Sequence, residues 1–208
     1  MKSLVTLLAM TLTLLAGCHG TGMHHHRERP LAEWERILEN PERDAWQRPS
    51  QVIAALQLKP DEVVADIGAG TGYFTRRFVP VVKSVYAVDI DTALLSAIMR
   101  GEPKNVVPVL AARDDPRLPQ ATIDTIFICD VLHHIVNRPR YYAKLREGLR
   151  ANGRIVVVDF HKRELPVGPP PGMKLADKQV IDEMALAGFR LAKRYDDLPY
   201  QYMLEFRR

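Results

Sequence analysis

From residue 63 onward, short continuous apolar runs alternate with segments whose apolar residues recur at helical spacing. Continuous runs are typical of strands buried on both faces of a parallel sheet. We expect such strands near residues 63–67, 85–89, 106–110, 123–129 and 154–160, and helices near 73–79, 92–99, 139–149 and 177–187. Alternation of this kind predicts a parallel sheet with helices on both faces.

The C-terminal end differs from this alternation. Two further strands are expected over residues 189–195 and 200–206, and only Asp196 to Pro199 join them. Such a connection is too short for a crossover helix, so the two strands should form an antiparallel hairpin. The predicted fold class is therefore α/β: a doubly wound, mostly parallel seven-stranded sheet that ends in a C-terminal antiparallel hairpin.

Three alternating glycines, Gly68, Gly70 and Gly72, follow the strand at 63–67 directly. Glycine allows positive φ and close approach of a ligand to the backbone, and the next helix offers unpaired N–H groups. A dinucleotide fingerprint would need its third glycine at position 73, where Tyr73 stands, so a nicotinamide oxidoreductase is disfavoured. Asp66, just before the turn, would repel a phosphate and attract an ammonium group, which favours S-adenosylmethionine.

A second acid supports this interpretation. Asp89 ends the next apolar run and lies 21 residues after Gly68. An acid at about this distance is placed to accept hydrogen bonds from both ribose hydroxyls of a bound nucleoside.

With these motifs the chain resembles class I S-adenosylmethionine-dependent methyltransferases, and in particular the small type-11-like branch. The resemblance covers roughly residues 46–206 and implies a Rossmann-like methyltransferase fold, S-adenosylmethionine as cofactor, and an enzyme of class EC 2.1.1. The cofactor-binding residues that it implies are Asp66, Gly68, Ala69, Gly70, Gly72, Tyr73, Asp89, Ile90 and Asp130.

The resemblance also suggests roles with open alternatives. Arg48, in the segment between the N-terminal helices, would meet the methionine carboxylate, or that segment is a surface helix anchored by Trp46. Asp114 or Asp115 would accept a hydrogen bond from the adenine amino group, although an Asp-Asp-Pro turn is also an ordinary way to leave a strand.

Two adjacent histidines follow the fourth strand, in a segment that in the resembling family faces the methyl acceptor. Methyl transfer needs mainly alignment of the reactants, and a base only where the acceptor must lose a proton. We expect His134 to be the base or the acceptor-orienting group, with His133 second. The alternative is that either histidine caps a helix or satisfies a carbonyl. The proline-rich loop at 162–173 should form a stiff wall of the acceptor pocket. His161 could line this pocket, although a solvated loop histidine is the preferred interpretation, and Tyr200 or Tyr202 could reach its edge or pack on alternate faces of the hairpin.

The N-terminal residues predict a location. Residues 1–17 combine a basic start with about a dozen apolar residues, which is typical of a signal peptide and too short to span a bilayer. The sequence Leu-Ala-Gly-Cys that ends at Cys18 resembles a bacterial lipobox, which implies lipidation of Cys18 and a place at the periplasm-facing membrane surface of the cell envelope. The alternatives are an ordinary signal peptide or an interfacial helix, and the protein would be cytoplasmic if the leader is not processed.

The rest of the chain divides into a tether and one domain. Residues 18–30 should be a tether, in which three adjacent histidines would bind metals only loosely. Residues 31–208 should be the methyltransferase domain, with N-terminal helices over 31–60 and the α/β core over 61–208.

Composition adds limits. Of the 208 residues, 47% are hydrophobic and 26% charged, as in ordinary globular proteins, and a net charge of +4 without a basic run does not point to nucleic acid. With only two cysteines, one expected to carry lipid, Cys129 should be a buried core thiol, and we expect no metal site. The oligomeric state is left open.

Two functions follow from the sequence. The first is methyl transfer to a small-molecule or protein acceptor. The second is an envelope lipoprotein that binds S-adenosylmethionine, its demethylated product or a related nucleoside without catalysis, since this cofactor is made in the cytosol and an exported enzyme would have to receive it.

Overall fold

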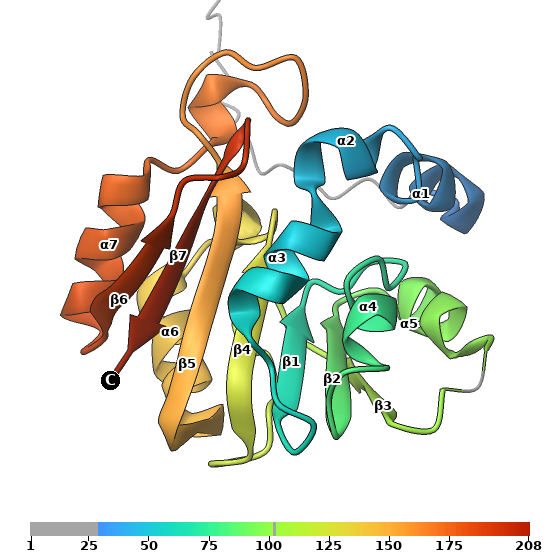
Figure 1. The fold of residues 1–208 in the computed structure, drawn as a ribbon, viewed down its shortest axis with the longest axis horizontal. Helices are drawn as coiled ribbons and strands as arrows, with labels where there is room; N and C mark the ends of the chain where they lie inside the picture. Colours follow the sequence, from blue (N-terminus) through green and yellow to red (C-terminus); the bar gives the residue numbers. More distant parts are fainter. Residues whose placement is uncertain (1–28, 102) are drawn as a thin grey trace, which may run out of the picture.

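A computed structural model describes residues 29–101 and 103–208, which form a seven-stranded sheet with helices on both faces (Figure 1). The strand order is β3-β2-β1-β4-β5-β7-β6. The β5–β7 and β7–β6 pairs are antiparallel, and every other pair of neighbouring strands is parallel. The predicted fold class and C-terminal hairpin are confirmed. The strands are β1 (Val63–Ile67), β2 (Ser84–Asp89), β3 (Val106–Leu110), β4 (Ile123–Cys129), β5 (Leu149–Phe160), β6 (Arg190–Tyr195) and β7 (Gln201–Arg207). The predicted leader, the lipidation residue Cys18 and the tether up to residue 28 lie outside the described residues.

Alternate residues of β1 divide the core into two layers. Val63, Ala65 and Ile67 pack with α6 and α7, whereas Val64 packs with α3, α4 and α5 on the opposite face. The helices are α1 (Leu31–Leu38), α2 (Arg43–Gln47), α3 (Pro49–Leu56), α4 (Thr75–Phe78), α5 (Thr92–Met99), α6 (Arg138–Gly148) and α7 (Asp177–Leu186), with short 3-10 helices η1 (Leu132–His134) and η2 (Pro171–Met173).

Two elements begin more than one residue away from their predicted starts. The helix after the glycine turn begins at Thr75 and not at residue 73, because Tyr73 and Phe74 still belong to the turn. Strand β5 begins at Leu149 and not at residue 154, and its pairing with β4 shifts register between Ile123 and Thr125. The early part of β5 is exposed and polar, so an apolar run could not reveal it.

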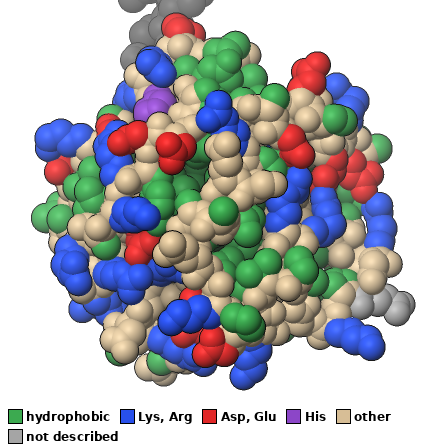
Figure 2. Space-filling view, viewed as in Figure 1, with side chains coloured by type: hydrophobic (Ala, Val, Ile, Leu, Met, Phe, Trp, Pro, Cys, Tyr) green, Lys and Arg blue, Asp and Glu red, His purple; other side chains and the backbone are tan. Residues whose placement is uncertain are grey.

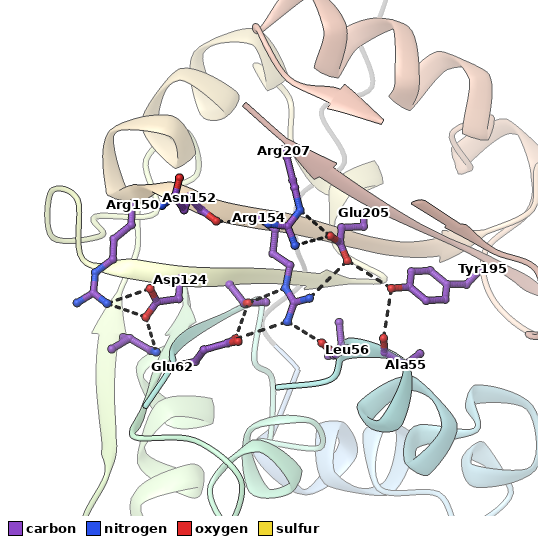
Figure 3. Close-up of polar contacts among 12 residues, drawn as sticks. Ala55, Leu56, Glu62, Asp124, Arg150, Asn152, Arg154, Tyr195, Glu205 and Arg207 are labelled. Atoms are coloured by element: carbon purple, nitrogen blue, oxygen red, sulfur yellow. Dashed lines mark hydrogen bonds and ion pairs between the residues drawn. The ribbon is translucent and has the colours of Figure 1, made fainter. Parts of the chain in front are cut away.

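A buried charged network docks α3 onto the sheet (Figure 3). Arg154 of β5 donates to the Leu56 carbonyl at the end of α3 (2.6 Å) and to Thr125 Oγ1 (2.9 Å). The same guanidinium lies 3.5 Å from carboxylate oxygens of Glu62 and Glu205. Arg154 and Glu205 are largely buried, and Glu205 also pairs with Arg207 at 2.9 Å, so each buried charge has an opposite charge beside it. The network thus holds the N-terminal helices in a defined position on the sheet.

The molecular surface carries mixed charge. Lys and Arg side chains are interspersed with Asp and Glu on the face seen in Figure 2. Among residues 29–101 and 103–208, no helix is long and apolar enough to cross a bilayer. The same described part of the chain holds no group of three or more His, Cys, Asp or Glu side chains placed to bind a metal ion.

Candidate functional site

The glycine turn between β1 and α4 requires glycine for two physical reasons. Gly68 and Gly70 have positive φ (68° and 57°), a backbone region that L side chains rarely adopt. A Cβ atom on Gly68 would lie 2.2 Å from a methyl carbon of Val131. The Gly68 and Ala69 N–H groups both donate to the Val88 carbonyl of β2, at 2.7 and 3.0 Å. The turn is thereby held close against the carboxyl ends of β1 and β2.

Asp89 joins the glycine turn to the end of β2. Its Oδ2 accepts a hydrogen bond from the Gly70 N–H (2.9 Å), and its Oδ1 accepts from the Asp91 N–H (3.0 Å). Burial raises the pKa of the Asp89 carboxyl, while these backbone donors lower it. The carboxylate is therefore fixed at the sheet edge, where the sequence predicted a ribose-binding acid.

Asp66 lies beneath the same turn and is only 3% exposed. The Thr75 hydroxyl of α4 donates to its Oδ2 at 2.6 Å. Burial raises the pKa of Asp66 to about 6, against the lowering effects of Thr75 and of the Arg43 charge. A cation placed beside this buried carboxyl would therefore stabilise its ionised form.

Arg43 of α2 is a site residue that the sequence analysis did not find. Its guanidinium carbon lies 3.8 Å from the centre of the Tyr73 ring, and its Nη2 lies 3.9 Å from Asp130 Oδ2. Arg48, which was predicted to reach the cofactor, instead donates to the Asp197 carbonyl at 2.7 Å, so the structure does not bring it to the turn. The helical spacing of Arg43 and Gln47 on one face of α2 is the signal that could have pointed to Arg43.

Tyr73 anchors α2 over the turn. Its ring lies between the guanidinium groups of Arg43 and Arg77, at 3.8 and 4.0 Å from the ring centre. Its hydroxyl donates to the Asp44 carboxylate, and burial raises its pKa. The contacts of Tyr73 in this structure are therefore with the N-terminal helices and α4, and its predicted contact with the cofactor stays a prediction.

Asp130 follows β4 in a strained backbone conformation, with φ of +59°. The Gln201 amide donates to its Oδ1 at 2.5 Å, and the thiol of buried Cys129 lies 3.6 Å from its Oδ2. Burial, and then the nearby Asp159 charge, raise the pKa of Asp130 to about 7. The prediction that Cys129 is a buried core thiol is confirmed.

The two adjacent histidines have different environments. His133 Nδ1 lies 2.9 and 3.1 Å from the two carboxylate oxygens of Asp159, and the exposed fractions of these side chains are 3% and 0%. Burial lowers the pKa of His133, but the hydrogen bond and charge of Asp159 outweigh it, and the net pKa is raised. His134 is exposed, with its ring 4.2 Å from that of His133. His133 is therefore oriented by a hydrogen bond to the Asp159 carboxylate, whereas the sequence analysis preferred His134 as the base.

The predicted adenine side lies at the ends of β2 and β3. Leu110 of β3 pairs with Asp89 of β2, and Ile90 follows Asp89; Ile90 and Leu110 are 41% and 42% exposed. Asp114 pairs with Arg140 of α6 at 3.3 Å, and Asp115 Oδ1 accepts from a backbone N–H within its own turn. Each predicted adenine-binding acid thus has a partner within the protein.

Two aromatic rings lie close together beside the loop that the sequence predicted to line an acceptor pocket. The rings of Trp46 (α2) and Phe160 (end of β5) lie 5.6 Å apart. The proline-rich loop packs on the same ring, since a Cβ on Gly168 would lie 2.7 Å from Phe160. Lys174, only 2% exposed, pins the loop by donating to the Arg163 carbonyl at 2.8 Å.

Of the other residues expected near this pocket, Tyr202 is fully buried and belongs to the core. The His161 ring lies 5.9 Å from that of Tyr202, and its backbone N–H donates to the Tyr200 carbonyl.

The fold and the glycine turn together define the class I S-adenosylmethionine-dependent methyltransferase architecture. Residues 65–157 match the type 11 family model of a methyltransferase domain. Among solved structures, a SAM-dependent methyltransferase from Aquifex aeolicus superposes with a TM-score of 0.79 at 21% identity, covering 86% of this chain and 98% of that one. A complex described as DhpI-SAM-HEP superposes with a TM-score of 0.67 at 16% identity, covering 86% and 92%.

Curated relatives carry methyltransferase names as well. The chain is 27% identical over 156 residues to the ubiquinone/menaquinone biosynthesis C-methyltransferase UbiE of Ectopseudomonas mendocina, covering 71% of this chain and 59% of the relative. It is 27% identical over 181 residues to a demethylmenaquinone methyltransferase of Thermobifida fusca, covering 82% and 70%. A 44-residue match to ribosomal RNA small subunit methyltransferase A of Rippkaea orientalis, 48% identical, covers 21% of this chain and 16% of that relative. The chain therefore has the fold of class I methyltransferases, its residues 65–157 match a methyltransferase domain, and these comparisons support S-adenosylmethionine as the cofactor.

Proposed function

We propose that this protein transfers a methyl group from S-adenosylmethionine to an acceptor, as an enzyme of class EC 2.1.1. The observation that carries the proposal is the Gly68–Gly72 turn, closed by the Asp89 carboxylate on the Gly70 N–H. The bound cofactor would supply a methyl group on a positively charged sulfur, so the leaving group needs no acid, and the protein mainly aligns the reactants.

The residues at the sheet edge fit this cofactor. Asp66 and Asp130 are buried carboxyls with raised pKa values, and an ammonium group between them would favour their ionised forms. Asp89 would accept hydrogen bonds from the ribose hydroxyls, and the exposed side chains of Ile90 and Leu110 would offer an apolar surface for adenine.

His133 is the proton acceptor that the geometry supports. Its Nδ1 is held by the Asp159 carboxylate, which fixes the ring and leaves Nε2 as the nitrogen that can take a proton from the methyl acceptor. This replaces His134 as our first choice, because the contacts of His133 include a buried carboxylate that orients it.

The acceptor we favour is a small aromatic compound with an ionisable hydroxyl group. The Trp46–Phe160 wall could stack such a ring, and His133 could remove its proton. The two relatives that cover most of this chain are named for methylation in ubiquinone or menaquinone biosynthesis, which supports the same class. A protein acceptor would require contacts beyond this pocket.

The test is a two-step assay. Calorimetry on residues 29–208 with S-adenosylmethionine first measures binding, and labelled S-adenosylmethionine is then incubated with a panel of phenols and quinols and with envelope protein extract. Transfer to a small phenolic compound supports the proposal. Binding without transfer to any acceptor would favour the alternative of a non-catalytic envelope protein, and label on protein would redirect the acceptor class.

We also propose that the enzyme is held at the bacterial cell envelope by lipid on Cys18. The support is the sequence Leu-Ala-Gly-Cys after a basic and apolar leader. A Cys18→Ser variant should lose membrane association when cells are fractionated. If the variant remains with the membranes as the parent does, the anchor is not at Cys18.

A further inference from the structure

Four side chains, two of them fully buried and two largely buried, are linked in a ring beside the glycine turn by three hydrogen bonds and one ion pair. Arg43 Nε donates to Gln47 Oε1 (3.3 Å), and Gln47 Nε2 donates to Gln201 Oε1 (2.7 Å). Gln201 Nε2 donates to Asp130 Oδ1 (2.5 Å), and Asp130 Oδ2 faces Arg43 Nη2 at 3.9 Å. We call these four residues the polar ring. It joins α2, the start of β7 and the end of β4.

The donors in the polar ring all point one way, from the guanidinium of Arg43 to the carboxylate of Asp130. Each glutamine accepts with its oxygen and donates with its nitrogen, so neither amide can flip without facing oxygen to oxygen or nitrogen to nitrogen. The cation polarises the first amide and the anion the last, and the ion pair closes the ring. This arrangement fixes the orientation of every member.

Burial makes the polar ring depend on the N-terminal helices. Gln47 and Gln201 are 0% exposed, and the side chains of Arg43 and Asp130 are 13% and 19% exposed. A buried amide without partners is costly, so displacement of α2 would leave Gln201 and Asp130 without the partners that it supplies. The ring is complete only when α2 lies against the sheet.

The segment that the polar ring holds also lies over the cofactor turn. We call residues 31–47, which contain α1 and α2, the strap. A Cβ on Gly70 would lie 2.9 Å from Cδ1 of Leu38, at the end of α1, and Glu39 accepts hydrogen bonds from Thr71 and Arg76. Figure 1 shows α1 and α2 above the carboxyl ends of the strands, beside α4 and α5.

We propose that Gln47 and Gln201 are positioning residues for cofactor binding: through the polar ring they hold the strap closed over the glycine turn and aim the Asp130 carboxylate at the methionine end of S-adenosylmethionine. The inference rests on the proposed function. Neither glutamine touches the cofactor in this assignment; each acts through Asp130 or through α2.

The two tryptophans of the chain make this testable, because Trp34 and Trp46 both belong to the strap. The test uses Gln201→Leu, with Gln179→Leu as matched control, since Gln179 also donates a side-chain hydrogen bond but lies on α7. Calorimetry with S-adenosylmethionine and tryptophan emission are recorded for the parent and both variants. We expect Gln201→Leu to bind about tenfold or more weakly, because a hydrogen bond to a charged group is lost. Its emission should shift to the red as the strap loosens, while Gln179→Leu should match the parent in both measurements.

A charge-exchange pair separates positioning from simple loss of folding. Gln201→Glu should weaken cofactor binding, because a second carboxylate would face Asp130. Adding Asp130→Asn restores every donor and acceptor of the ring but moves the negative charge onto residue 201. This double variant should recover the parent emission spectrum and melting temperature while its cofactor affinity stays reduced.

The pH dependence of affinity is the second readout. Loss of the Gln201 donor should move the midpoint of the affinity–pH curve upward, which a purely structural role would not do. If Gln201→Leu binds the cofactor with parental affinity and midpoint, the positioning assignment is wrong while the proposed function stands. If the parent protein itself binds no S-adenosylmethionine, the proposed function is wrong and this inference with it.

Discussion

His133 Nδ1 lies 2.9 Å from Asp159 Oδ1; His133 is in η1, which follows β4, and Asp159 is near the end of the neighbouring strand β5. Asp159 also accepts a hydrogen bond from the Phe160 N–H at 2.8 Å, so the carboxylate is fixed by its own backbone. A histidine held in this way presents its other ring nitrogen in one direction, at the edge of the sheet where the glycine turn lies.

From this pair we predict separate effects for the two histidines. His133→Ala should lower the transfer rate about 10²- to 10⁴-fold, the usual contribution of a base, and leave S-adenosylmethionine affinity within a factor of a few. His134→Ala is the matched control and should retain most of the activity. Single-turnover kinetics and calorimetry check both variants. Equal losses for the two would contradict the assignment to His133.

Asp159→Asn should change the pH profile. Asp159 raises the pKa of His133, and the base is active only when neutral, so activity should increase as pH rises through this raised pKa. With asparagine in place of the carboxylate the pKa falls, and the rising limb of the rate–pH curve should move to lower pH. A rate profile that keeps its position would show that His133 does not titrate in the reaction.

Asp89→Ala should weaken S-adenosylmethionine binding, because the ribose acceptor and the contact to the Gly70 N–H are both lost. We expect at least a tenfold increase in Kd, the size of a lost hydrogen bond to a charged group. Asp91→Ala is a suitable control, since Asp91 caps α5 through the Ala93 N–H. Calorimetry on both variants measures the difference, and equal affinities would contradict a ribose-binding role for Asp89.

Cofactor affinity should increase with pH between about 5.5 and 7.5. Burial raises the pKa of Asp66 to about 6 and that of Asp130 to about 7, and an ammonium group is attracted only to their ionised forms. Binding near pH 6 should therefore release protons, which calorimetry in buffers of different ionisation enthalpy detects. Heats that are the same in all buffers would argue against ionisation on binding.

The same shifts have the opposite consequence for the stability of the free protein. A carboxyl whose pKa is higher in the folded than in the unfolded chain stabilises the fold at low pH and loses this effect as pH rises through the folded value. Asp66 and Asp130 should thus lower the free energy of unfolding between about pH 4 and 7. Asp66→Asn should flatten this part of a denaturation–pH series, with Asp182→Asn, an exposed carboxylate, as the control.

Arg154→Ala should destabilise the protein by about 3–5 kcal/mol, because it removes the cation beside the largely buried carboxylate of Glu62 and leaves Glu205 with Arg207 alone. Lys178→Ala, which removes an exposed pair with Asp182, should cost less than about 1 kcal/mol. Denaturant unfolding of both variants gives the comparison. A small effect at Arg154 would mean that other groups satisfy these carboxylates.

The sequence predicted secondary structure correctly where the conformation of a segment depends mainly on its own residues. The apolar runs predicted β1, β3 and β4 to the residue, and the alternating glycines predicted the turn that follows β1, because strand burial and positive φ are properties of consecutive residues. The start of β5 was missed, since residues 150–152 are exposed and interrupt the apolar pattern, and Leu149 is placed in the strand by its pairing with β4.

The chain by itself therefore determined the order of strands and helices, the class of fold and the position of the turn. Only the tertiary structure decided which charged and polar groups face each other: Asp159 on His133 and not on His134, Arg43 and not Arg48 near Asp130, and Gln201 joined to Gln47 across 154 residues. These contacts depend on how the sheet edge, the strap and the C-terminal hairpin pack together, so they cannot be predicted from the spacing of residues along the chain.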